Sequence, residues 1–131
     1  KLISDGDIAG VIHAVNTEDT GIDIYLGSGG APEGVLAAAA LRCIGGRMQG
    51  KLILDTPAKR DHAVAMGITD PNRVYDVSEL AAGDVLVAAT GVTDGTLLDG
   101  IRLRRRSVET STIVMRSWSQ TARWIRAQHA R

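Results

Sequence analysis

Four acidic side chains stand near glycines at points where the chain is expected to turn. They are Asp5, Asp7, Glu33 and Asp94. Each is predicted to lie near a strand end or a helix start, and ligands in open α/β sheets bind at the carboxyl ends of strands. Carboxylate oxygens are the ligands that Mg²⁺ and Mn²⁺ prefer, so two or three of them around one crevice would suit metal-assisted phosphoryl chemistry. For Glu33 alone, an exposed glutamate stabilised by a helix dipole is at least as good an interpretation.

The glycine-rich segment 27–34, Gly-Ser-Gly-Gly-Ala-Pro-Glu-Gly, is the feature that could hold an anion near such carboxylates. Residues 21–26 before it alternate apolar and polar side chains, which predicts a strand. Residues 35–44 after it are rich in alanine and end at two glycines, which predicts a helix with Pro32 in its first turn. The backbone N–H groups at such a helix start bind anions, typically phosphate.

Several better-known sites are excluded by single residues. A P-loop requires Lys and Ser or Thr where this chain has Val35 and Leu36. A nucleophile elbow requires glycine where Leu26 stands, and a dinucleotide fingerprint requires a small residue where Pro32 stands. The three histidines lack ligand spacing. Cys43 lies in an apolar helix, which predicts a buried hydrophobic side chain rather than a nucleophile.

Charge is balanced over the 131 residues but is unevenly spread along them. Residues 101–131 carry eight arginines against Glu109 alone. Such a run can indicate a nucleic-acid or phosphate partner, but we favour a solvated face together with a surface that meets another part of the protein. The sequence contains no signal peptide and no apolar run of membrane length, so we expect a cytoplasmic protein. It begins at Lys1 without methionine, and we expect a piece of a longer protein.

The order of apolar runs and turns predicts one α/β domain over residues 1–131, with a mixed, mostly parallel sheet flanked by helices. Besides the elements around segment 27–34, we expect helices at 8–15 (capped by Asp7), 57–66 and 119–129, a helical turn at 78–82, and strands at 2–4, 48–54, 73–75, 84–90, 101–108 and 110–116. The last two strands are expected to pair in antiparallel fashion. Arg102, Arg104 and Arg106 alternate, which puts them on one strand face.

Five blocks of this sequence closely resemble the class II (GlpX-type) fructose-1,6-bisphosphatases, in the order and spacing of that family. They are residues 2–9 (Leu-Ile-Ser-Asp-Gly-Asp-Ile-Ala), 29–35 (Gly-Gly-Ala-Pro-Glu-Gly-Val), 39–43 (Ala-Ala-Leu-Arg-Cys), 89–95 (Ala-Thr-Gly-Val-Thr-Asp-Gly) and 115–117 (Met-Arg-Ser). The resemblance covers nearly the whole chain but only the C-terminal portion of the family. It implies the layered α/β fold of the lithium-sensitive, magnesium-dependent sugar phosphatases.

The resemblance also implies an activity and a set of site residues. Family members hydrolyse the 1-phosphate of fructose 1,6-bisphosphate in gluconeogenesis or a pentose cycle, with Mg²⁺ or Mn²⁺, and cyanobacterial relatives also accept sedoheptulose 1,7-bisphosphate. Carried over by matching blocks, Glu33 is a metal ligand, and Asp5, Gly6, Asp7 and Gly30 line the substrate site. The other metal carboxylates and the catalytic threonine region precede this portion, so no catalytic residue is identified here and the fragment alone is expected to be inactive. The implied partners are the N-terminal remainder of the same polypeptide and further copies in a homo-oligomer, with neither nucleic acid nor membrane.

Two other functions remain open. A non-catalytic, phosphometabolite-binding regulatory module would also retain Glu33 without further carboxylates. A nucleic-acid-binding domain would use the arginine-rich end, but the chain offers only two tyrosines and two tryptophans on which bases could stack, so we rank it last.

Overall fold

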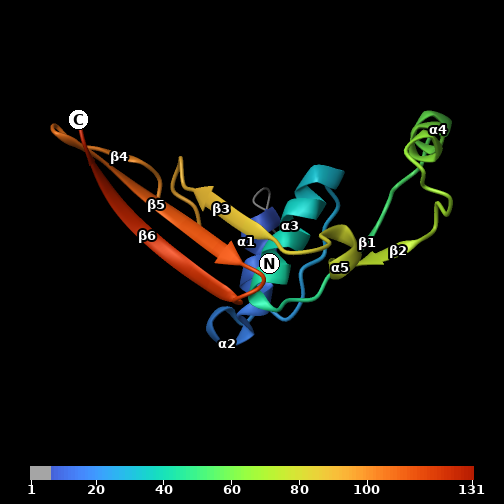
Figure 1. The fold of residues 1–131 in the computed structure, drawn as a ribbon, viewed down its shortest axis with the longest axis horizontal. Coiled ribbons are helices and arrows are strands. Elements are labelled where there is room, and N and C mark those ends of the chain that lie inside the picture. Colours follow the sequence, from blue (N-terminus) through green and yellow to red (C-terminus); the bar gives the residue numbers. More distant parts are fainter. Residues whose placement is uncertain (1–6) are drawn as a thin grey trace.

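The computed structural model describes residues 7–131 (Figure 1). Helices α1 (Asp7–Val15) and α3 (Ala31–Ile44) lie at the centre of an elongated molecule, with the short α2 (Thr17–Thr20) between them in sequence. A long sheet extends from the helices on one side, and an arm that ends in α4 (Pro57–Ala65) extends on the other. The expected strand at residues 2–4 lies outside the described residues.

Helix α3 forms where the alanine-rich run predicted a helix. Gly30 is its N-cap, with an extended backbone, and Pro32 lies in the first turn, where a missing N–H leaves no bond unmade. At the other end Gly45 takes the left-handed conformation with φ 82° and donates its N–H to the carbonyl of Leu41, which ends the helix. The small side chains from Ala37 to Ala40 are buried, so α3 can pack closely on its neighbours.

The main sheet contains β3 (Leu86–Thr90), β4 (Arg102–Leu103), β5 (Ser107–Arg116) and β6 (Thr121–Ala130), and each of its pairings is antiparallel. The second sheet pairs β1 (Gln49–Lys51) with β2 (Val74–Asp76), also antiparallel, and α5 (Val77–Leu80) follows directly. The prediction of a mostly parallel sheet was therefore wrong. Parallel neighbours need long crossover connections, whereas β5 and β6 are joined by a four-residue turn at 117–120.

Three expected elements differ from the structure. Residues 119–129, expected to be a helix, form β6, which pairs with β5 over ten residues from Arg116↔Thr121 to Ser107↔Ala130. Residues 21–26, expected to be a strand, have no regular structure, and Leu26 is 83% exposed. The strand expected at 48–54 is limited to 49–51, since only that part has a ladder partner. The helix at 57–66 and the strand at 84–90 are confirmed within a few residues. The antiparallel pairing expected near the arginines is also present, but its first strand is limited to 102–103, and residues 107 and 108 of the expected strand 101–108 belong to β5.

The core lies between the two central helices and one face of the main sheet. Ile12 of α1, Ala40 and Cys43 of α3, and Ile113 and Met115 of β5 form its centre. Val87 of β3 and Ala122 of β6 pack against this cluster from the strands on either side. The helices therefore cover only the half of the sheet near the β5–β6 turn.

Candidate functional site

The start of α3 brings two of the predicted site residues together. The Glu33 carboxylate folds back over Gly30, so that a Cβ atom added to Gly30 would collide with Glu33 Oε2. Within residues 7–131 no side-chain hydrogen bond caps this helix start, and the carbonyl of Gly30 accepts from the N–H of Gly34 at 3.1 Å. Both residues are exposed. An anion could therefore reach the first-turn N–H groups, and a cation could reach the carboxylate beside them.

The other predicted substrate residues are only partly visible. Asp5 and Gly6 lie outside the described residues. Asp7 is the first residue of α1 rather than its N-cap, so the helix begins one residue earlier than expected. Val11 of α1 packs against Ala37 and Leu41 of α3, which fixes the two helices against each other.

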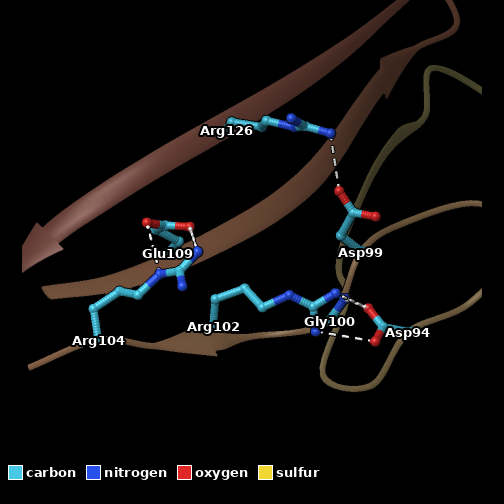
Figure 2. Close-up of polar contacts among 7 residues, drawn as sticks. All are labelled: Asp94, Asp99, Gly100, Arg102, Arg104, Glu109 and Arg126. Atoms are coloured by element: carbon cyan, nitrogen blue, oxygen red, sulfur yellow. Dashed lines mark hydrogen bonds and ion pairs between the residues drawn. The ribbon is translucent and has the colours of Figure 1, made fainter.

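Asp94, the fourth carboxylate, has a structural role instead of joining Glu33. Its Oδ1 accepts from the backbone N–H of Gly100 at 2.9 Å and from Arg102 Nη2 at 2.6 Å, and its Oδ2 accepts from Arg102 Nη1 at 2.9 Å (Figure 2). The bond with Arg102, followed by that with Gly100, lowers the pKa of Asp94. Three donors thus occupy the oxygens that a metal would need.

Residues 7–131 by themselves do not form a complete metal centre. Within this range no three His, Cys, Asp or Glu side chains are placed to hold one ion. Glu33 could supply one oxygen ligand, and the remaining ligands would have to come from other residues. The hypothesis of several carboxylates around one crevice is therefore not supported by the described part of the chain.

The arginine-rich end forms ion pairs around the far end of the main sheet (Figure 2). Besides Arg102 with Asp94, Arg104 Nε donates to Glu109 at 3.3 Å and Arg126 Nη2 donates to Asp99 at 2.9 Å. Arg102 lies in β4 beside β5, but β4 ends at Leu103, so Arg104 and Arg106 lie in the turn that follows. The prediction that the three arginines share one strand face was therefore wrong. Sequence reasoning missed the pairing of Arg126 with Asp99. A prediction of residues 121–130 as a strand could have found it, because that strand places Arg126 opposite Ser111 of β5.

Cys43 is buried at the core, as predicted. Its Sγ lies 3.7 Å from the carbonyl oxygen of Val85, and burial raises the pKa of the thiol. A raised pKa disfavours the thiolate, which is the nucleophilic form. Among the described residues, no helix is long and apolar enough to cross a membrane.

Comparison with known proteins gives a consistent family. Residues 1–129 match the family model for bacterial fructose-1,6-bisphosphatase, glpX-encoded. The chain is 43% identical to the D-fructose 1,6-bisphosphatase class 2/sedoheptulose 1,7-bisphosphatase of Synechococcus elongatus, and 44% and 41% identical to the proteins of that name from Crocosphaera subtropica and a Synechocystis species. Each match covers 98% of this chain but 41% of the relative, so the chain spans about two fifths of their length. The chain belongs to the glpX-encoded fructose-1,6-bisphosphatase family.

Proposed function

We propose that the polypeptide carrying this chain hydrolyses the 1-phosphate of fructose 1,6-bisphosphate to give fructose 6-phosphate, and that sedoheptulose 1,7-bisphosphate is a second substrate. The observation that carries this proposal is the family match over residues 1–129, whose relatives are named for both activities. Because the chain spans about two fifths of those relatives, it is proposed to supply only part of the site.

In this proposal Glu33 donates a carboxylate oxygen to Mg²⁺ or Mn²⁺. A bound ion of this kind activates the attacking water and neutralises charge that develops on the phosphate. The support is chemical: Glu33 is an exposed hard-oxygen donor beside open N–H groups, in a place where both an ion and a phosphate can approach.

The remaining assigned residues would bind the substrate. Gly30, without a side chain, leaves the helix start accessible, and any larger residue would push into the Glu33 carboxylate. Asp5 and Asp7 would accept hydrogen bonds from sugar hydroxyls, with Gly6 allowing a close approach of the backbone. The first-turn N–H groups of α3 would orient an anionic group of the substrate.

The first prediction concerns Glu33→Gln in the longer natural polypeptide that contains these residues. Phosphate release from fructose 1,6-bisphosphate is measured with and without Mg²⁺ or Mn²⁺. We expect metal-dependent release by the parent and a loss of about 100-fold or more in the variant, since an amide binds the ion far more weakly than a carboxylate does.

Glu18→Gln is the matched control, because Glu18 is also an exposed glutamate in the first turn of a helix. It should leave the rate unchanged. Release that is undiminished in Glu33→Gln would remove Glu33 from its role but keep the enzyme. No release by the parent under any metal condition would refute the bisphosphatase and favour a phosphometabolite-binding module.

A further inference from the structure

A pocket of about 380 Å³ lies against the end of the main sheet that is far from the core helices. Three arginines line it, Arg102, Arg104 and Arg126, together with Asp99, Glu109 and Ser111. A volume of this size is within the range of small-molecule sites. The pocket shares no residue with the start of α3, where the site proposed above lies.

The floor of this arginine pocket lies on the same face of β5 as the core, but its residues are polar. Met115 and Ile113 on that face are covered by the helices. The next residues on the same face are Ser111, opposite Arg126, and Glu109, opposite Gln128. The strand therefore changes from apolar to polar along one face, at the point where the helices end.

A hydrogen-bonded loop forms one wall of the pocket. Residues 91–101 connect β3 to β4, and the N–H of Ile101 donates to the carbonyl of Val92 at 3.1 Å. Gly100 is buried, and a Cβ atom there would lie 2.6 Å from the backbone carbon of Thr93. Within the loop, Asp94 accepts a hydrogen bond from the N–H of Gly100, and Asp99 accepts one from Arg126. This wall of the pocket is therefore held by hydrogen bonds within the protein.

The arginines differ in how firmly they are held. Arg102 makes a bidentate pair with Asp94. Arg104 reaches Glu109 only at 3.3 and 3.4 Å, and Arg126, whose side chain is 85% exposed, bonds one oxygen of Asp99. Exposed ion pairs of this kind contribute little and exchange readily. Arg105 and Arg106 in the adjoining turn add positive charge.

We propose that the arginine pocket binds a phosphate group, as inorganic phosphate or as the phosphate of a small monoester, with Arg104 and Arg126 as its principal donors. Guanidinium groups bind phosphate oxygens in bidentate geometry, and a dianion between two arginines gains more than a singly charged carboxylate does. The proposal is independent of the proposed function, because it requires only binding.

The test is hydrogen–deuterium exchange followed by mass spectrometry on the longer natural polypeptide, without added divalent metal. Inorganic phosphate and glycerol 3-phosphate are titrated separately. We expect protection in peptides that cover residues 94–104 and 121–130. Protection by phosphate alone would identify the inorganic ion, and tighter binding of glycerol 3-phosphate would identify a monoester. Both outcomes support the pocket.

In the double variant Arg104→Gln/Arg126→Gln, the ligand concentration that gives half-maximal protection should rise at least about 10-fold, since two charge-assisted contacts are lost. The double variant Arg104→Lys/Arg126→Lys keeps the charge but loses the planar guanidinium. Its ligand affinity should lie between that of the parent and that of the double glutamine variant. Arg123→Gln is the control, because Arg123 lies on the same strand but pairs with Val114 on the opposite face. Unchanged exchange in α3 verifies that each variant is folded.

Three results would overturn the proposal. The first is no protection by either ligand, which would indicate that the arginines bind acidic side chains of the protein instead of phosphate. The second is protection that the double variant and Arg123→Gln affect equally, which would indicate general charge attraction. The third is protection by a single-stranded oligonucleotide but by neither small ligand, which would assign the surface to nucleic acid.

Discussion

Asp94 and Glu33 show how similar carboxylates take different roles according to their neighbours. Each lies three residues after a glycine in a block that resembles the family, and both were candidates for metal binding. Asp94 is bonded to Gly100 and Arg102, so its oxygens stabilise a loop. Glu33 folds over a glycine at a helix start and remains exposed. At the residue scale, the hydrogen-bond partners distinguish a structural carboxylate from a candidate ligand.

We predict that Asp94→Asn lowers the thermal unfolding midpoint at neutral pH and that this effect disappears in acid. The pKa of Asp94 is lowered in the folded chain, so its pairing stabilises the fold above the unfolded pKa of about 3.9 and is lost as the pH falls through the folded value. Unfolding midpoints of parent and variant are compared in a series from about pH 7 down to acid well below the unfolded pKa of about 3.9.

Asp23→Asn is the comparison, since Asp23 is an exposed aspartate in the irregular segment 21–30. The unfolding midpoint of Asp23→Asn should differ little from that of the parent, and the difference should not shrink as the pH falls. A gap between parent and Asp94→Asn that stays constant down to the lowest pH would show that the carboxylate charge is not what stabilises the loop.

At the scale of elements, local signals predicted α1, α3 and α4 but not the arrangement of the sheet or the strand β6. Pro32 and Gly45 mark the two ends of α3 through backbone geometry, which acts locally and can be inferred from the sequence alone. The segment 119–129 has alanine, tryptophan and isoleucine at spacings that also fit a helix. It becomes β6 because ten residues of β5 lie beside it, and that pairing is a tertiary effect.

In the candidate site, too, local features could be predicted and tertiary ones could not. The contact between Glu33 and Gly30 is local and follows from the helix start. The pairing of Asp94 with Arg102 was not predictable from local signals, because Arg102 is placed by β4, which pairs with β5.

The loop between β3 and β4 gives a prediction at this scale. Gly100→Ala should lower the free energy of unfolding by about 1–3 kcal/mol, because the new methyl group would meet the backbone of Thr93 and Asp94, which must shift. Chemical denaturation measures the change. Gly95→Ala in the same loop is the control, since its Cβ would have only an ordinary contact at 3.7 Å with the Leu98 carbonyl. Equal costs for the two variants would contradict the close approach at Gly100.

At the scale of the whole molecule, one face of the main sheet remains open within residues 7–131. The helices pack on the face of Ile113 and Met115. Ile125 and Leu86 lie on the other face, 45% and 53% exposed. The relatives are more than twice as long as this chain. We therefore expect this open face to be covered in the longer polypeptide.

We predict that Ile125→Asp costs at least about 2 kcal/mol of unfolding free energy in the longer polypeptide, as expected for a charge placed in an apolar contact. Arg123→Gln, two residues away on the same face, should cost far less, because a polar side chain is already accommodated there. The measurement is denaturant unfolding. A change below about 0.5 kcal/mol for Ile125→Asp, typical of an exposed site, would show that the face stays in solvent.

The order of the core residues along the chain has a consequence for biosynthesis. Helices α1 and α3 end at Val15 and Ile44, far before the two β5 side chains, Ile113 and Met115, that they cover. Until β5 has left the ribosome, the sides of these helices that face Ile113 and Met115 therefore lack their β5 partners. The β5–β6 hairpin, in contrast, pairs residues joined by a short turn, so it can close as soon as it emerges. During that interval the helices are the natural target of chaperones that bind exposed apolar surface.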